Sequence, residues 1–161
     1  MEIKKLSLKN LNKIMALYNE IKEHSINFWD KNYPNEEIAR CDIEKNGLYG
    51  VFISNKLIGI SFLGQRCEEN EEGFTWNENF SNRGTFSRIG VSPAYQHQGI
   101  ATALVKFILE ELKNRGFDGV RILVEKDNSN ALGLYKKFNF NICGEAYRYG
   151  HNFWLMEKRL F

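Results

Sequence analysis

An apolar pattern at 84–92, followed by a short loop and a long helical pattern at about 98–114, constrains the fold more than any other part of the sequence. The first stretch has the length and composition of a strand. In the second stretch apolar residues recur on one side of a helix, at Ile100, Leu104, Phe107, Ile108 and Leu112. Gly116 suits the end of that helix, because glycine adopts the left-handed conformation in which many helices end. The segment therefore predicts a strand, a loop and a helix in succession.

The loop between this strand and this helix has a composition that suits phosphate binding. Gly99 and Ala101 are small and lie at the expected start of the helix. The first amide groups of a helix have no partner within it, and the helix dipole adds partial positive charge there. Small side chains let a phosphate approach these amides, so the segment predicts a pyrophosphate site. Taken alone, the glycine is equally consistent with tight packing of the helix against its strand.

Two other phosphate-binding motifs are excluded in this loop. The lysine and the Ser/Thr that follow the second glycine of a nucleotide P-loop are missing. The Gly-x-Gly-x-x-Gly pattern of dinucleotide-binding folds is missing as well.

Patterns along the rest of the chain predict further strands and helices around this segment. In chain order they are a strand at 2–7, a helix opening at Asn10, a helix at 35–46, strands at 48–54 and 57–65, a strand around 120–124, a helix at 129–138, and strands at 140–148 and 151–159. The polar, acidic stretch 66–82 predicts an exposed loop. This order predicts an α/β fold, an α+β mixed sheet with helices on both faces, in a single domain spanning 1–161.

Composition narrows the class of protein. The chain is 43% hydrophobic and 14% aromatic, which is ample for a packed core. Its 22 basic and 20 acidic side chains give a net charge of +2, so the balance offers no case for nucleic-acid binding. No apolar run reaches transmembrane length and the N-terminus lacks a signal-peptide pattern, so no membrane association is expected.

Cysteine and histidine usage points to a reducing compartment. Three cysteines and three histidines stand far apart and form no ligand spacing: Cys41, Cys67, Cys143, His24, His97 and His151. Neither a metal site nor a disulfide framework is therefore expected. Unpaired cysteines favour a cytoplasmic location.

Two further motifs complete a resemblance to a known family. The string Gln96-x-x-Gly99-x-Ala101 resembles the pyrophosphate-binding motif of the GCN5-related N-acetyltransferases, the GNAT family. The residues 88–93 resemble that family's fourth strand, and 128–140 resemble its second cofactor motif, Asn-x-x-Ala-x-x-x-Tyr. The order of predicted elements matches the fold from end to end. The resemblance implies the GNAT acyl-CoA N-acyltransferase fold, with a mixed, mostly antiparallel sheet whose central strands splay apart.

The resemblance also implies acetyl-CoA as cosubstrate and a set of residues that bind it. The pantetheine arm is expected along the strand backbone at 89–91, with the amide of Val91 as the donor to the oxyanion, and the pyrophosphate at the amides of 98–102. The implied cofactor-binding residues are Ile89, Gly90, Val91, Gln96, His97, Gln98, Gly99, Ile100, Ala101, Thr102, Asn128, Ala131 and Tyr135. Asn128 is alternatively a helix cap, or serves in both roles. Tyr135 is implied as the hydroxyl beside the thioester sulfur; the alternative is an ordinary core tyrosine.

The general base is less well defined. An amine must lose a proton before it attacks, and many members of the family place a glutamate on the fourth or fifth strand for this. The fourth strand has no carboxylate here, and the common position on the fifth strand is twelve residues before the tyrosine. That position is Leu123 here. Glu125 lies two residues further on and, by strand alternation, on the same face. It is a candidate base acting through water, with a solvated strand-end glutamate as the other interpretation.

The acceptor site is expected among aromatic residues of the first helices and last strands. Candidates are Phe28, Trp29, Tyr33 and Tyr149, with Tyr147 and Trp154 as further aromatics. Aromatic rings suit a cationic amine, although packing explains each of them equally well. The predicted function is acetyl transfer to a primary amine of a small molecule or a peptide, by a monomer or homodimer. Alternatives are a non-catalytic acyl-CoA sensor and a transferase of the same fold with another acyl donor.

Overall fold

Two compact units make up the chain in the computed structural model, which describes residues 1–24, 29–67 and 71–161. The first unit comprises Met1–Gly64 and Phe86–Ile108, and the second comprises Gln65–Thr85 and Leu109–Phe161. The fourth strand and the third helix each begin in one unit and end in the other.

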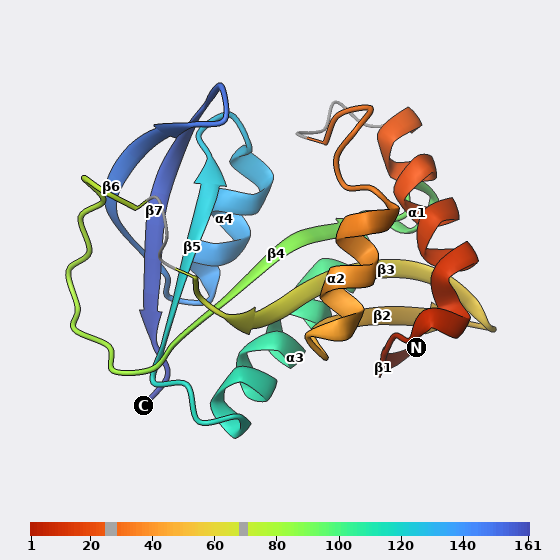
Figure 1. Ribbon diagram of the computed structural model, residues 1–161, viewed down its shortest axis with the longest axis horizontal. Coiled ribbons are helices and arrows are strands. Elements are labelled where there is room, and N and C mark those ends of the chain that lie inside the picture. Colours follow the sequence, from red (N-terminus) through yellow and green to blue (C-terminus); the bar gives the residue numbers. More distant parts are fainter. Residues whose placement is uncertain (25–28, 68–70) are drawn as a thin grey trace. The chain divides into compact units, whose positions relative to one another are not determined.

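Each predicted strand and helix is present (Figure 1). The strands are β1 (Glu2–Lys5), β2 (Leu48–Ile53), β3 (Lys56–Gln65), β4 (Arg83–Val91), β5 (Gly119–Glu125), β6 (Asn141–Arg148) and β7 (His151–Arg159). The helices are α1 (Leu11–His24), α2 (Glu36–Glu44), α3 (Ile100–Asn114) and α4 (Ser129–Lys137), with short 3₁₀ helices at Leu8–Asn10 and Pro93–Tyr95. Among the described residues, the strands form one mixed sheet in the order β1-β2-β3-β4-β5-β7-β6.

Helix α3 begins two residues later than the sequence pattern predicts. His97 has a φ of 62° and Gly99 a φ of 80°, both in the left-handed region, which a right-handed helix cannot include. The same preference explains the predicted stops: Gly116 has a φ of 90° and Asn139 a φ of 66°.

Helices cover both faces of the strands in the first unit. On one face, α1 buries Ile14, Leu17 and Tyr18 in a cluster that includes Phe52 and Ile60 of the strands. This apolar burial is the main driving force for holding the helix on the sheet.

The opposite face of these strands receives α3. The ring of Phe107 lies 5.1 Å from that of Tyr49 on β2. A side chain on Gly59 of β3 would meet Ile100 at 3.3 Å, so the absence of a Cβ lets the helix start approach the strand. This packing fixes the first turn of α3 relative to β3.

The strands of the second unit are mostly antiparallel. β7 pairs with both β5 and β6 in antiparallel register, and Arg121, Leu123 and Glu125 lie opposite Glu157, Leu155 and Phe153. β4 joins β5 in parallel through two residue pairs, Arg83 with Gly119 and Gly84 with Val120. This ladder is short beside the nine and seven residues of the two strands.

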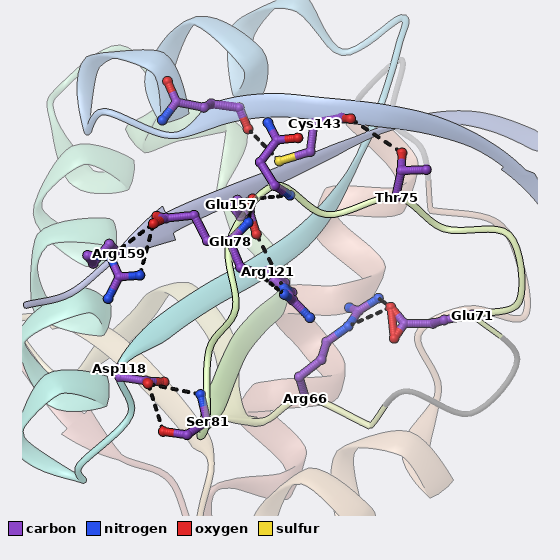
Figure 2. A network of polar contacts seen from close by, with 12 residues as sticks. Arg66, Glu71, Thr75, Glu78, Ser81, Asp118, Arg121, Cys143, Glu157 and Arg159 are labelled. Atoms are coloured by element: carbon purple, nitrogen blue, oxygen red, sulfur yellow. Dashed lines mark hydrogen bonds and ion pairs between the residues drawn. The ribbon is translucent and has the colours of Figure 1, made fainter.

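The segment 66–82 is not simply an exposed loop, which corrects the prediction from sequence. In its described part, the backbone amides of Asn77 and Glu78 donate to the buried Glu157 carboxylate at 2.7 and 2.9 Å. Arg121 lies 3.3 Å from the same carboxylate (Figure 2). Its guanidinium carbon also lies 4.9 Å from the centroid of the Trp76 ring. Buried charges require partners, and this segment supplies two donors to Glu157 from 80 and 79 residues away along the chain.

No helix in the described ranges is long and apolar enough to cross a membrane.

Candidate active site

The start of α3 has the geometry that the sequence predicts for an anion site. Gly99 is left-handed, and a Cβ built on it meets no atom within 4 Å. The first i→i−4 bond of the helix runs from the amide of Ala103 to the carbonyl of Gly99 at 3.0 Å. The amides of 100–102 therefore precede the helical ladder, at the positive end of the helix dipole. Residues 96–99 are exposed, so this end of the helix is open to a ligand.

Two glutamine side chains brace the loop before α3. The Gln96 amide donates to the carbonyl of Val91 at 3.3 Å, and the Gln98 amide donates to that of Ala94 at 3.4 Å. Because both side chains are hydrogen-bonded within the loop, these two residues would contact a phosphate through their backbone amides.

The end of β4 is anchored by a contact that the sequence gives no sign of. Ser92 is fully buried, and its amide donates to the carbonyl of Ile58 on β3 at 2.7 Å. Its hydroxyl donates to the carboxylate of Glu20 on α1. A serine after a strand predicts only a loop. Its carboxylate partner, Glu20, is apparent only in the folded structure, where α1 brings it to Ser92.

The second half of β4 departs from a regular strand. Arg88 has a φ of 53°, an uncommon conformation for a residue with a Cβ. Residues 87–91 are all partly exposed, whereas β3 is buried from Leu57 to Gly64. The strand thus presents an irregular and accessible backbone where the sequence predicts contact with pantetheine.

Arg88 is held by two side chains of the first unit. Its guanidinium donates to both carboxylate oxygens of Asp42 at 2.8 and 2.6 Å, and to the Tyr33 hydroxyl at 3.2 Å. Burial works against the charge on Arg88, but the hydrogen bonds and charge of Asp42 outweigh it and raise the pKa of Arg88.

Trp29 lies directly against β4. A Cβ on Gly90 would come within 2.7 Å of the indole ring, so glycine is required for the ring to reach the strand backbone. The ring also packs edge-on against Tyr18, with centroids 5.6 Å apart. Of the predicted acceptor residues, Trp29 and Tyr33 are therefore both brought to β4. Phe28 lies outside the described residues.

In the second unit Asn128 caps α4. Its side-chain oxygen accepts from the amide of Ala131 at 3.2 Å, which bears out the interpretation of this residue as a helix cap. The amide nitrogen of Asn128 is the group that would reach a ligand, so the two proposed roles are compatible.

Tyr135 is a buried residue of α4. It is 5% exposed, and its ring centroid lies 5.9 Å from that of Phe140. Burial raises the pKa of its hydroxyl, which therefore stays protonated at neutral pH and acts as a hydrogen-bond donor.

Glu125 is less solvated than a strand-end glutamate usually is. Its side chain is 12% exposed and its carboxylate lies 2.5 Å from Nδ1 of His151. Burial raises the pKa of Glu125, the charge of His151 lowers it and Asp127 raises it, with a net rise. Glu125 and His151 are 26 positions apart in the sequence and meet only because β5 and β7 pair.

The remaining aromatic candidates do not gather around Glu125. Tyr149 is 81% exposed in the β6–β7 turn, and Tyr147 is 63% exposed. Trp154 lies opposite Val124, on the other face of the strand pair from Glu125, with the Lys126 ammonium 4.3 Å from its ring centroid. The aromatic residues of the last strands thus do not form one cluster.

The family model named Acetyltransferase (GNAT) family matches residues 11–140, and the chain belongs to this family. The [Ribosomal protein bS18]-alanine N-acetyltransferase of Escherichia coli strain K12 is 30% identical over 92 residues, which is 56% of this chain and 61% of that protein. The streptothricin acetyltransferase of Escherichia coli is 27% identical over 125 residues, 78% of this chain and 63% of that protein. These matches span about three fifths of the length of the curated relatives.

A solved structure shares the fold over nearly the whole chain. The PaiA N-acetyltransferase of Thermoplasma acidophilum, in complex with coenzyme A, superposes with a TM-score of 0.74 at 21% identity and covers 98% of each chain.

Proposed function

We propose that this chain is an acetyl-CoA-dependent N-acetyltransferase, one domain over 1–161, acting on a primary amine. The observation that carries the proposal is the left-handed Gly99 at the open start of α3, in a member of the GNAT family. A residue with a side chain would be strained at this φ and would fill the space that a phosphate needs. The coenzyme A bound to the Thermoplasma acidophilum protein of the same fold supports the choice of cofactor.

We assign cofactor contacts in each unit separately. The backbone amides from Gln98 to Thr102 would hold the pyrophosphate, and the accessible backbone of 89–91 would pair with the pantetheine arm. Asn128 would add its side-chain nitrogen, and Tyr135 its protonated hydroxyl beside the sulfur. The bound cofactor supplies an activated acetyl thioester, and the proposal includes no metal.

The protein's own groups have three tasks in this reaction. A group must accept the proton of the protonated amine, a donor must stabilise the oxyanion, and a donor must stabilise the departing sulfur. We assign the oxyanion to the backbone amide of Val91 and the sulfur to Tyr135. Glu125 belongs to the route by which the amine loses its proton.

The acceptor is a primary amine of a small molecule or a peptide. Two aromatic side chains lie at β4. Trp29 packs on Gly90, and the Tyr33 hydroxyl accepts a hydrogen bond from Arg88. Such rings suit the organic part of an amine and, before deprotonation, its charge. Related proteins carry names for both classes, a ribosomal-protein alanine and the antibiotic streptothricin. The proposed location is the cytoplasm, where acetyl-CoA would be available and unpaired cysteines stay reduced.

A thiol-release assay tests this function. The chain is incubated with acetyl-CoA and a panel of alkylamines, amino acids, aminoglycosides and short peptides with free N-termini, and free CoA is measured. Turnover with at least one amine is expected. Tight binding of acetyl-CoA without turnover on the whole panel would instead indicate an acyl-CoA sensor, and turnover only with a longer acyl donor would indicate a different transferase.

A further inference from the structure

The contact between Glu125 and His151 is fixed by the pairing of β5 with β7. The strand register places Glu125 opposite Phe153, and His151 lies two residues before Phe153 on the same face of β7. The Nδ1 atom of His151 is 2.5 Å from the carboxylate, which is 12% exposed, while the imidazole is 50% exposed. The carboxylate is thus the sheltered partner and the imidazole is the one that meets solvent.

The backbone around His151 is fixed by a tight turn. Tyr149 and Gly150 have φ values of 54° and 79°, the combination required by a two-residue hairpin turn that matches strand twist. Arg148 and His151 then form the first pair of the β6–β7 ladder. The Phe153 ring lies 6.3 Å from the imidazole. His151 therefore starts a strand and does not hang from a free loop.

The acidic groups around the pair come from β5 and the loop that follows it. Glu125 faces it directly from β5, and Asp127 follows in the loop after that strand. The nearby cations are engaged elsewhere: Arg148 donates to the carbonyls of Tyr147 and Glu72, and the Lys126 ammonium lies 2.6 Å from Glu145.

The bond to Glu125 also determines which nitrogen can react. When Nδ1–H of the neutral imidazole donates to the carboxylate, Nε2 carries the lone pair. A buried acceptor on Nδ1 holds the ring orientation and stabilises the imidazolium that forms when Nε2 takes a proton. Leu123 lies two residues before Glu125 on the same face of β5, and its side chain has no group that could accept a proton.

We propose that His151 is the catalytic proton acceptor for the amine substrate, and that Glu125 is a positioning residue that orients it. This inference rests on the acetyltransferase function proposed above. Nε2 of His151 takes one proton from the protonated amine and later releases it to water. The neutral amine adds to the thioester carbon and the carbonyl electron pair moves to oxygen. The oxyanion then re-forms the carbonyl as the C–S bond breaks and the electron pair of that bond moves to sulfur. The second amine proton reaches the departing sulfur through the Tyr135 hydroxyl, so acetamide, free thiol and one proton result.

Three variants test the assignment, with melting temperature and acetyl-CoA binding measured for each. His151→Ala is expected to lower kcat for an alkylamine at pH 7 by about 10²-fold, the low end of general-base effects. Glu125→Gln is expected to lower it less, by about tenfold, because the imidazole remains but is less well oriented. His24→Gln, at an exposed histidine near the end of α1, is the control and is expected to leave kcat unchanged.

Two readouts separate proton transfer from a structural role. Added imidazole is expected to raise kcat of His151→Ala by at least about tenfold, because a free base can enter the vacated, solvent-exposed position. With a weakly basic arylamine, which is already neutral at pH 7, the loss in His151→Ala is expected to shrink to a few-fold. In His151→Ala, kcat/KM for the alkylamine is expected to depend more steeply on pH than in the wild type, because only the neutral amine, a small fraction below its pKa of roughly 10.4, can then react.

The outcomes distinguish this inference from the function on which it rests. If the wild type turns over amines while His151→Ala keeps full activity or gains nothing from imidazole, the enzyme stands and His151 is not its base. Equal losses for the alkylamine and the arylamine would likewise overturn the role in proton transfer. If the wild type binds acetyl-CoA but acetylates no amine on the panel, both the proposed function and the proposed role of His151 are wrong.

Discussion

Arg88 and Asp42 form a two-point ion pair, with guanidinium nitrogens 2.8 and 2.6 Å from the two carboxylate oxygens. The pair joins β4 to α2 within the first unit. Arg88 occupies a left-handed backbone conformation, which costs free energy for a residue with a side chain. The ion pair offsets that cost and holds the irregular part of β4, next to the backbone at 89–91 that we propose for cofactor binding.

Asp42→Asn is expected to lower the free energy of unfolding by about 3 kcal/mol, because the substitution leaves a mostly buried guanidinium without its counter-charge. Urea denaturation measures the change. The double variant Asp42→Asn with Arg88→Met is the control, and it should regain much of the loss because no unpaired charge remains. An unchanged stability for Asp42→Asn would show that the pair contributes nothing to holding β4.

Gly99→Asp is expected to abolish most of the rise in Tm that acetyl-CoA gives the wild type. A ligand that binds only the folded state stabilises it, and a carboxylate at the start of α3 repels phosphate and fills its space. Differential scanning fluorimetry with and without acetyl-CoA measures the effect. Gly73→Asp, at another left-handed glycine with open space around it, controls for strain. A Gly99→Asp protein that folds and binds CoA like the wild type would contradict the pyrophosphate assignment.

Tyr135→Phe is expected to lower kcat by about ten- to a hundredfold, the low end of general acid effects, since a thiolate is a tolerable leaving group. The ring and its contact with Phe140 remain, so affinity for acetyl-CoA should stay within a few-fold. Steady-state kinetics and a binding titration separate the two quantities. Unchanged kcat would assign Tyr135 to packing alone, and a large loss of stability would assign its hydroxyl to the fold.

Asp118 gives the stability of the second unit a defined pH dependence. Its carboxylate accepts from the amide and the hydroxyl of Ser81, each at 2.9 Å (Figure 2). It also accepts from the amide of Asn82 at 2.9 Å. These hydrogen bonds lower the pKa of Asp118 to about 2, below the roughly 3.9 of an unfolded chain. A depressed pKa contributes stability that is present above about pH 4 and lost as pH falls toward 2.

The test is Asp118→Asn, which should be less stable than the wild type at pH 7, with the difference narrowing as pH is lowered from about 5 to about 2. Urea denaturation at a series of pH values measures it. A difference that stays constant across this range would show that the charge of Asp118 is not what secures Ser81 and Asn82.

The fold was largely predictable because its signals are local. Apolar periodicity located the strands and helices, and residues that tolerate the left-handed region, such as Gly116 and Asn139, marked where helices end. The glycine at 99 and the asparagine at 128 were likewise found from short motifs, since a helix start and a helix cap each depend on a few consecutive residues. The start of α3 was misplaced by two positions, because Gly99, which lies inside the predicted helix, has a left-handed backbone that a right-handed helix cannot include.

The sequence by itself determined the order of elements, the family and the segments that bind cofactor in our proposal. Tertiary structure alone decided which distant side chains meet: Arg88 with Asp42, Glu20 with Ser92, and Glu125 with His151. Strand register and helix packing set these contacts, and neither can be read from local periodicity. The segment 66–82 shows the same limit, since its polar composition gave no sign that its amides would satisfy the buried Glu157 carboxylate. A buried charge takes its partners wherever the fold brings a donor within reach, whatever their separation along the chain.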